Sequence, residues 1–96
     1  MTEIAPAETL LEGRWITAGG AVQADEVAVR IERLIADYLK FRAAHDGGWS
    51  KLFRDPADGR YWELTFPSSH VHGGGPPRLE NISDAAAHSR YGVNEA

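Results

Sequence analysis

The sequence predicts a small α+β domain, in which an antiparallel sheet has one long helix packed on one face and is followed by a short C-terminal helix. Two observations carry this prediction. Apolar residues recur at helical spacing after Asp25, and residues 49–66 have the pattern of a β-hairpin. We expect residues 1–96 to form a single domain, because a chain of 96 residues is too short for two independent cores.

The N-terminal part predicts a tail and then a short hairpin. We expect residues 1–10 to form a flexible tail, because they contain Pro6 and show no apolar period. Residues 14–17 predict a short strand, and Gly19 and Gly20 predict a turn into a brief return strand.

The long helix is expected from Asp25 to about Ala44. Asp25 is a suitable N-cap, and Gly47 and Gly48 favour termination. The apolar stripe consists of Val27, Ile31, Leu34, Ile35, Tyr38 and Leu39. Such a stripe can bind a partner helix, but a sheet follows directly, and we interpret the stripe as core packing.

The hairpin follows from its turn residues. Pro56 and Gly59 favour a four-residue loop that places Asp55 opposite Arg60. In this register Phe53 opposes Trp62, and opposed residues share a face of the sheet. The predicted core face holds Trp49, Phe53, Trp62, Leu64 and Phe66.

The other face of this hairpin is mixed in character. It holds Leu52, Arg54, Tyr61, Glu63 and Thr65. Two interpretations remain open: a solvated sheet face with an Arg54–Tyr61 pair, or a contact surface for another protein, since Tyr and Arg are favoured at interfaces.

The C-terminal part predicts a strand and a capped helix. Residues 77–82 are typical of a strand, Ser83 is a suitable cap for a helix over 84–91, and Gly92 favours its end. We expect both helices of the domain on the same side of the sheet.

Between the strands lies a segment with two histidines, three glycines and two prolines. His70 and His72 point to one face if the segment is extended, which suits a transition metal when further ligands arrive. No other residue lies at a spacing that completes such a site. A shaped binding loop is the preferred interpretation, and a small metal-binding module or metal-dependent enzyme using His70 and His72 is the alternative.

Composition narrows the class of protein. A net charge of −4 disfavours non-specific nucleic-acid binding, and the absence of cysteine excludes disulfides and thiol chemistry. No apolar run approaches a membrane span, and no basic residue precedes Arg14 as a signal peptide would require. We therefore expect a cytoplasmic protein without a membrane contact.

Several motifs resemble the immunity protein 27 family of bacterial polymorphic toxin systems. They are Arg54-Asp55-Pro56, the run from Asp58 to Leu64, Pro67, and His72-Gly-Gly-Gly-Pro-Pro-Arg-Leu79. Upstream, residues 13–16 and 30–35 lie where similar members have a short strand and a long helix. The resemblance extends from about Leu11 to Gly92.

The resemblance implies a protein that binds and neutralises a toxin encoded beside it, with no catalysis and no cofactor. It implies a toxin partner. From the net charge we expect no nucleic-acid partner, and we expect a monomer or weak homodimer. With the mixed sheet face and the glycine-proline segment as one surface, the expected partner contacts are Arg54, Tyr61, Glu63, His70, His72 and Arg78.

Overall fold

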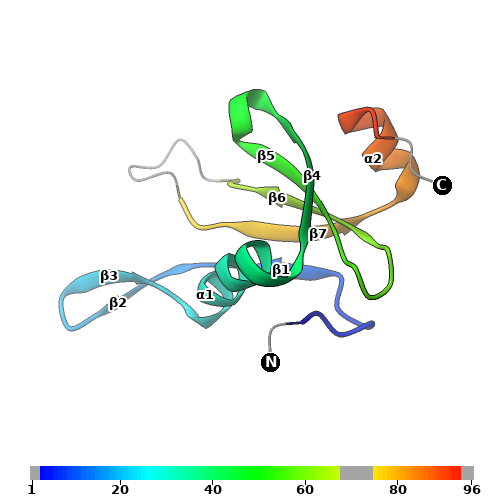
Figure 1. The fold of residues 1–96 in the computed structure, drawn as a ribbon. Helices are drawn as coiled ribbons and strands as arrows, with labels where there is room; N and C mark the ends of the chain where they lie inside the picture. Colours follow the sequence, from blue (N-terminus) through cyan, green and yellow to red (C-terminus); the bar gives the residue numbers. More distant parts are fainter. Residues whose placement is uncertain (1–2, 68–74, 94–96) are drawn as a thin grey trace.

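The computed structural model describes residues 3–67 and 75–93 (Figure 1). In these ranges, five strands form an antiparallel sheet in the order β1-β7-β6-β5-β4, and β2 and β3 form a separate two-stranded sheet. The strands are β1 (Leu10–Glu12), β2 (Trp15–Ala18), β3 (Ala21–Ala24), β4 (Lys40–His45), β5 (Ser50–Arg54), β6 (Tyr61–Thr65) and β7 (Arg78–Ile82), and the helices are α1 (Glu26–Arg33) and α2 (Asp84–Tyr91). The predicted α+β class is confirmed.

The β5–β6 hairpin has the predicted register. Phe53 opposes Trp62, and Arg54 opposes Tyr61. Gly59 closes the loop with a φ of 77°, and the Asp55 amide donates to the Arg60 carbonyl at 2.9 Å. The turn residues and the alternation of side chains therefore specify the same pairing.

The predicted end of the long helix is wrong. α1 passes into a π-helical turn, η1 (Leu34–Tyr38), and Leu39 is extended with a ψ of 148°. The chain then forms β4, where helix was expected, and Gly47 lies in the turn between β4 and β5. Ala43 and Ala44 favour a helix on local propensity, but pairing with β5 overrides it.

The two helices lie on opposite faces of the sheet, so the expectation of a single helical side is also wrong. α1 packs through Ile31, and η1 through Leu34, on a core of Phe53, Trp62, Leu64 and Leu79. α2 packs through Ala87 on the other face. That second core contains Leu52, Tyr61, Ile82 and Ala87. The cap residues at both helices are as predicted: Asp25 accepts from the Ala28 amide and Ser83 from the Ala86 amide.

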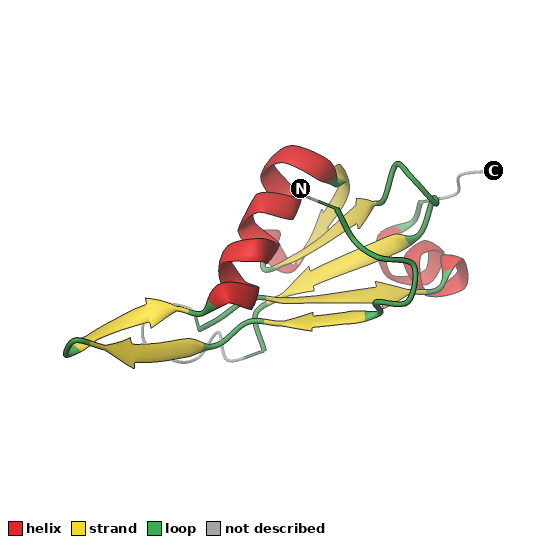
Figure 2. Ribbon diagram, turned by 90° about the horizontal axis from the view of Figure 1, so that it is seen from below, coloured by secondary structure: helices red, strands yellow, loops and turns green. Residues whose placement is uncertain are grey.

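The N-terminal segment packs against the body from Glu3 onward. Ile4 is 6% exposed and belongs to the core beneath α1. Glu8 pairs with Arg30 of α1, and Arg60 donates to the carbonyl of Glu8 at 2.7 Å. β1 then forms an outer strand of the five-stranded sheet beside β7. Figure 2 shows α1 over this sheet and the β2–β3 hairpin extending away from it.

Candidate partner-binding surface

The β2–β3 hairpin is an arm that stands apart from the main sheet. Its turn is made by Gly19 and Gly20, with φ values of 59° and 80°, the two positive angles that suit a two-residue hairpin turn. At its base the Asp25 amide donates to the Arg14 carbonyl at 3.0 Å. We call residues 15–24 the arm.

The arm is uncharged and exposed. No Asp, Glu, Lys or Arg occurs between Trp15 and Ala24, although 25% of the chain is charged. Trp15 is 39%, Ile16 46% and Val22 70% exposed. A two-stranded hairpin is marginally stable by itself, and exposed strand edges are usually protected by charges. An unprotected apolar ribbon of this kind is typical of a surface that another protein covers.

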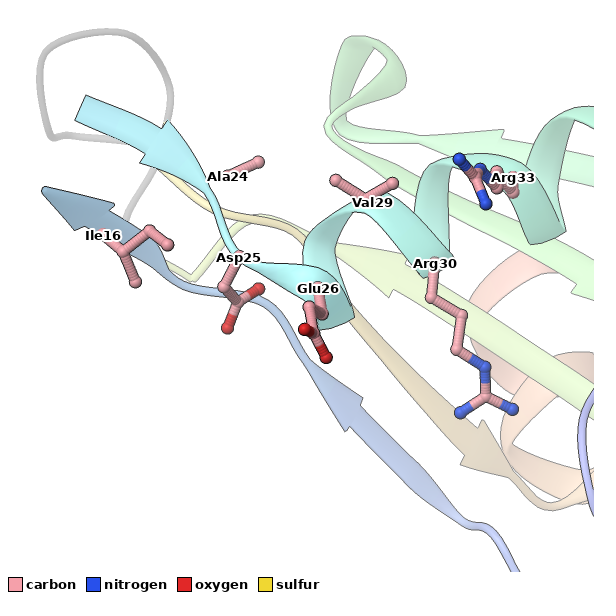
Figure 3. Close-up of a pocket in the computed structure, with 7 residues that line it drawn as sticks. All are labelled: Ile16, Ala24, Asp25, Glu26, Val29, Arg30 and Arg33. Atoms are coloured by element: carbon pink, nitrogen blue, oxygen red, sulfur yellow. The ribbon is translucent and has the colours of Figure 1, made fainter. Parts of the chain in front are cut away.

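A groove of about 420 Å³ separates the arm from α1. Its lining residues are Ile16, Ala24, Asp25, Glu26, Val29, Arg30 and Arg33. Figure 3 shows Ile16 on β2, with Asp25 and Glu26 at the start of α1 between it and Arg30. The groove therefore has an apolar wall from the arm and a charged wall from the helix.

One charged wall residue is held in place by the N-terminal segment. Arg30 donates from both terminal nitrogens to the Glu8 carboxylate, each at 2.6 Å, and also to the Glu3 carbonyl at 3.0 Å. The hydrogen bond from Arg30 lowers the pKa of Glu8 to about 2. The position of the Arg30 side chain at the groove wall is therefore fixed by Glu8.

The expected open face of the hairpin is largely covered. Arg54, Tyr61 and Glu63 share one face, as predicted, but α2 lies over it. Tyr61 is 4% and Glu63 9% exposed, while Arg54 is half-buried with its guanidinium carbon 5.5 Å from the centre of the Tyr61 ring. The sequence marks α2 as a helix but does not indicate which face it covers.

Glu63 is held by α2. Its two carboxylate oxygens accept hydrogen bonds from Arg90 and from the Tyr91 hydroxyl, both at 2.8 Å. Burial, together with the bond to Glu63, raises the pKa of the Tyr91 phenol. The contacts of Glu63 in the folded chain are thus those of a residue that fixes α2 to the sheet.

Arg78 begins β7 opposite Thr65, which places it on the same face of the sheet as Tyr61 and Glu63. It is half-buried and lies 3.5 Å from carboxylate oxygens of Glu12 and of Glu80. Near it, the Gly13 amide donates to the Pro77 carbonyl at 2.8 Å. His70 and His72 lie outside the described residues. Within the described ranges, no group of three or more His, Asp or Glu side chains is placed to hold a metal ion.

The sequence-based candidates do not include the arm. The signal that marks it is present in the sequence: ten successive residues, 15–24, without a charge, around a glycine pair. The alternation of Trp15, Thr17 and Val22 on one face and Ile16 and Gln23 on the other then gives both faces apolar side chains.

The family model for immunity protein 27 matches residues 17–83, more than two thirds of the chain. The chain belongs to the immunity protein 27 family. Comparison with curated proteins and with solved structures found no match. The immunity protein 27 match begins inside β2 and ends at Ser83, the cap of α2. It therefore includes β3, α1 and strands β4 to β7. Neither helix of the described ranges has the length and apolar character required to cross a bilayer.

Proposed function

We propose that this chain is an immunity protein that binds and neutralises a cognate bacterial toxin in the cytoplasm of the producing cell. Membership of the immunity protein 27 family supports the role, and the exposed uncharged arm supports binding to another protein. The partner is the toxin encoded beside this chain. Neutralisation is stoichiometric and needs no cofactor.

Steric occlusion is the mechanism that the geometry favours. A narrow ribbon ending in a two-glycine turn can enter a cleft that a flat surface cannot, and the adjacent groove can receive a side chain of the toxin. Trp15, Ile16 and Val22 supply the apolar contact area, since aromatic and aliphatic anchors dominate the binding energy of protein interfaces. An arm seated in the toxin's cleft would exclude its substrate.

Further contacts are proposed from the sequence. Arg54 and Arg78 are half-buried, so each retains surface that a partner can reach. His70 and His72 belong to the same proposal. Tyr61 and Glu63 contribute by fixing α2 to the sheet, because burial leaves them little surface for a direct contact.

Co-expression with the neighbouring toxin gene tests the function. We expect the chain to restore growth and to elute with the toxin as one complex in size-exclusion chromatography. The control is the same strain carrying an unrelated small protein. Continued growth arrest at equal protein levels, with the two proteins eluting separately, would refute the proposal.

A further inference from the structure

β4 is an edge strand of the five-stranded sheet, and its chemistry differs from that of the arm. It ends the five-stranded sheet and pairs with β5 on one side only within the described ranges. Phe41 on this strand is 57% exposed and lies edge-on to Phe53 with ring centres 5.8 Å apart. An unpaired edge presents a row of backbone donors and acceptors to any extended chain.

Three cations gather beside this edge. Lys40 of β4 lies opposite Arg54 of β5, and a bulge inserts Arg42 between the paired residues Phe41 and Ala43. Lys40, Arg42 and Arg54 line a hollow of about 280 Å³ with Asp55, Pro56 and Gly59. This concentration of positive charge occurs in a chain whose net charge is −4.

The residues that line the hollow include three cations and one carboxylate. Its one carboxylate, Asp55, is fully buried and its Oδ1 already accepts hydrogen bonds from the Tyr38 hydroxyl and the Ala57 amide. Arg54 is oriented by a 3.2 Å bond from its Nε to the Gly59 carbonyl and by the Tyr61 ring. A guanidinium held in this way is suited to a carboxylate, because little side-chain entropy is lost on binding.

Cations on an edge strand commonly serve to prevent pairing with other chains. The same cations select a partner when its strand is acidic, since the repulsion then becomes attraction. A second copy would bring a like set of cations to the edge. A nucleic acid would be repelled by the net charge and would leave the backbone groups of β4 unpaired.

We propose that the β4 edge accepts an extended acidic segment of the toxin as an added strand, with one of its carboxylates in the hollow lined by Lys40, Arg42 and Arg54. The main-chain bonds of such an added strand supply affinity, and the charges supply selectivity and a fast encounter. The identity of the partner rests on the proposed function; the recognition of an acidic strand does not.

The first test measures affinity for the neighbouring toxin. Lys40→Gln/Arg42→Gln should raise the dissociation constant about tenfold and flatten its dependence on salt. The matched control, Ala7→Glu/Ala85→Glu, changes the net charge by the same amount at two exposed sites away from β4 and should bind as the wild type does. The charge-preserving Lys40→Arg/Arg42→Lys should also retain affinity. Unchanged affinity and salt dependence in the glutamine variant would overturn the proposal while leaving toxin binding intact.

The second test does not need the toxin. In amide NMR spectra of the full chain, a short peptide of alternating valine and glutamate should shift the signals of residues 40–45. The same peptide with lysine in place of glutamate should not. If the toxin does not bind but the acidic peptide does, the proposed function fails and the acidic-strand site stands. Absence of shifts along β4, or equal shifts with both peptides, would overturn the site.

Discussion

The hydroxyl of Tyr38 donates a 2.6 Å hydrogen bond to Oδ1 of Asp55, which joins the end of the α1–η1 helix to the loop of the β5–β6 hairpin. Asp55 is fully buried and organises that loop, because its Oδ1 also accepts from the Ala57 amide at 2.8 Å. The hydrogen bond to Asp55 raises the pKa of Tyr38 to about 12. Helix termination and hairpin closure are therefore coupled through one side-chain contact.

Removing the Tyr38 hydroxyl should destabilise the whole domain. Tyr38→Phe leaves a buried carboxylate with one donor fewer, and we expect a loss of about 1–3 kcal/mol in the free energy of unfolding. Urea denaturation measures it. In a double-mutant cycle with Asp55→Asn, the Tyr38→Phe change should cost less than it does in the wild type. Additive costs would mean that the two residues do not interact energetically.

Because Glu8 is paired with Arg30, the free energy of unfolding should fall at acid pH. The pKa of Glu8 is lowered from 4.5 to about 2 by its bond to Arg30, so the folded chain keeps this carboxylate ionised where the unfolded chain protonates it. Its contribution is complete above pH 4.5 and is lost as the pH falls toward 2. Glu8→Gln should therefore lower the melting temperature at neutral pH, and the difference from wild type should shrink over that acid range. A difference independent of pH would contradict the assignment.

Local signals in the sequence predict the elements that contain turn or cap residues. Asp25, Ser83 and Gly92 mark helix ends, and the Pro56 to Gly59 loop determines the β5–β6 register. β4 is not predicted, because Ala43 and Ala44 suit a helix and only the neighbouring β5 makes them a strand.

The candidate site is less predictable than the fold, because exposure depends on tertiary packing. Tyr61 and Glu63 occupy the predicted face, yet α2 returns over it and buries them. The position of a C-terminal helix on one side or the other of a sheet follows from small side chains such as Ala87, which give no distinctive pattern. The arm, by contrast, contacts α1 through β3 and still leaves Ile16 and Val22 exposed, and its lack of charge is visible in the sequence.

Replacing Glu63 should lower the free energy of unfolding, because its carboxylate joins β6 to α2. Glu63→Gln loses the ion pair with Arg90 and places an amide against the Tyr91 hydroxyl, so we expect a cost of about 1–3 kcal/mol. The control is Glu80→Gln, the half-buried carboxylate directly opposite on β7, which should cost less. Equal unfolding free energies for Glu63→Gln and wild type in urea would show that Glu63 does not anchor α2.

Gly13 should not tolerate a side chain. A Cβ there would lie 2.9 Å from the Ala28 Cβ and 2.9 Å from the Pro77 carbonyl oxygen, closer than packed atoms approach. Gly13→Ala should cost about 1–3 kcal/mol by overpacking, which thermal melting detects. Ala85→Ser adds one atom at an exposed site and serves as the comparison. A wild-type melting temperature for Gly13→Ala would mean that β1 and the Pro77 segment separate without cost.

Growth of cells that co-express the toxin with Ile16→Glu/Val22→Glu shows whether the uncharged arm neutralises the toxin. Both side chains are exposed, so the free energy of unfolding should change by no more than about 0.5 kcal/mol per site. Circular dichroism and melting of the purified variant check this. We expect a folded variant, present at wild-type level, that no longer protects the cells. Protection equal to that of the wild type would contradict it.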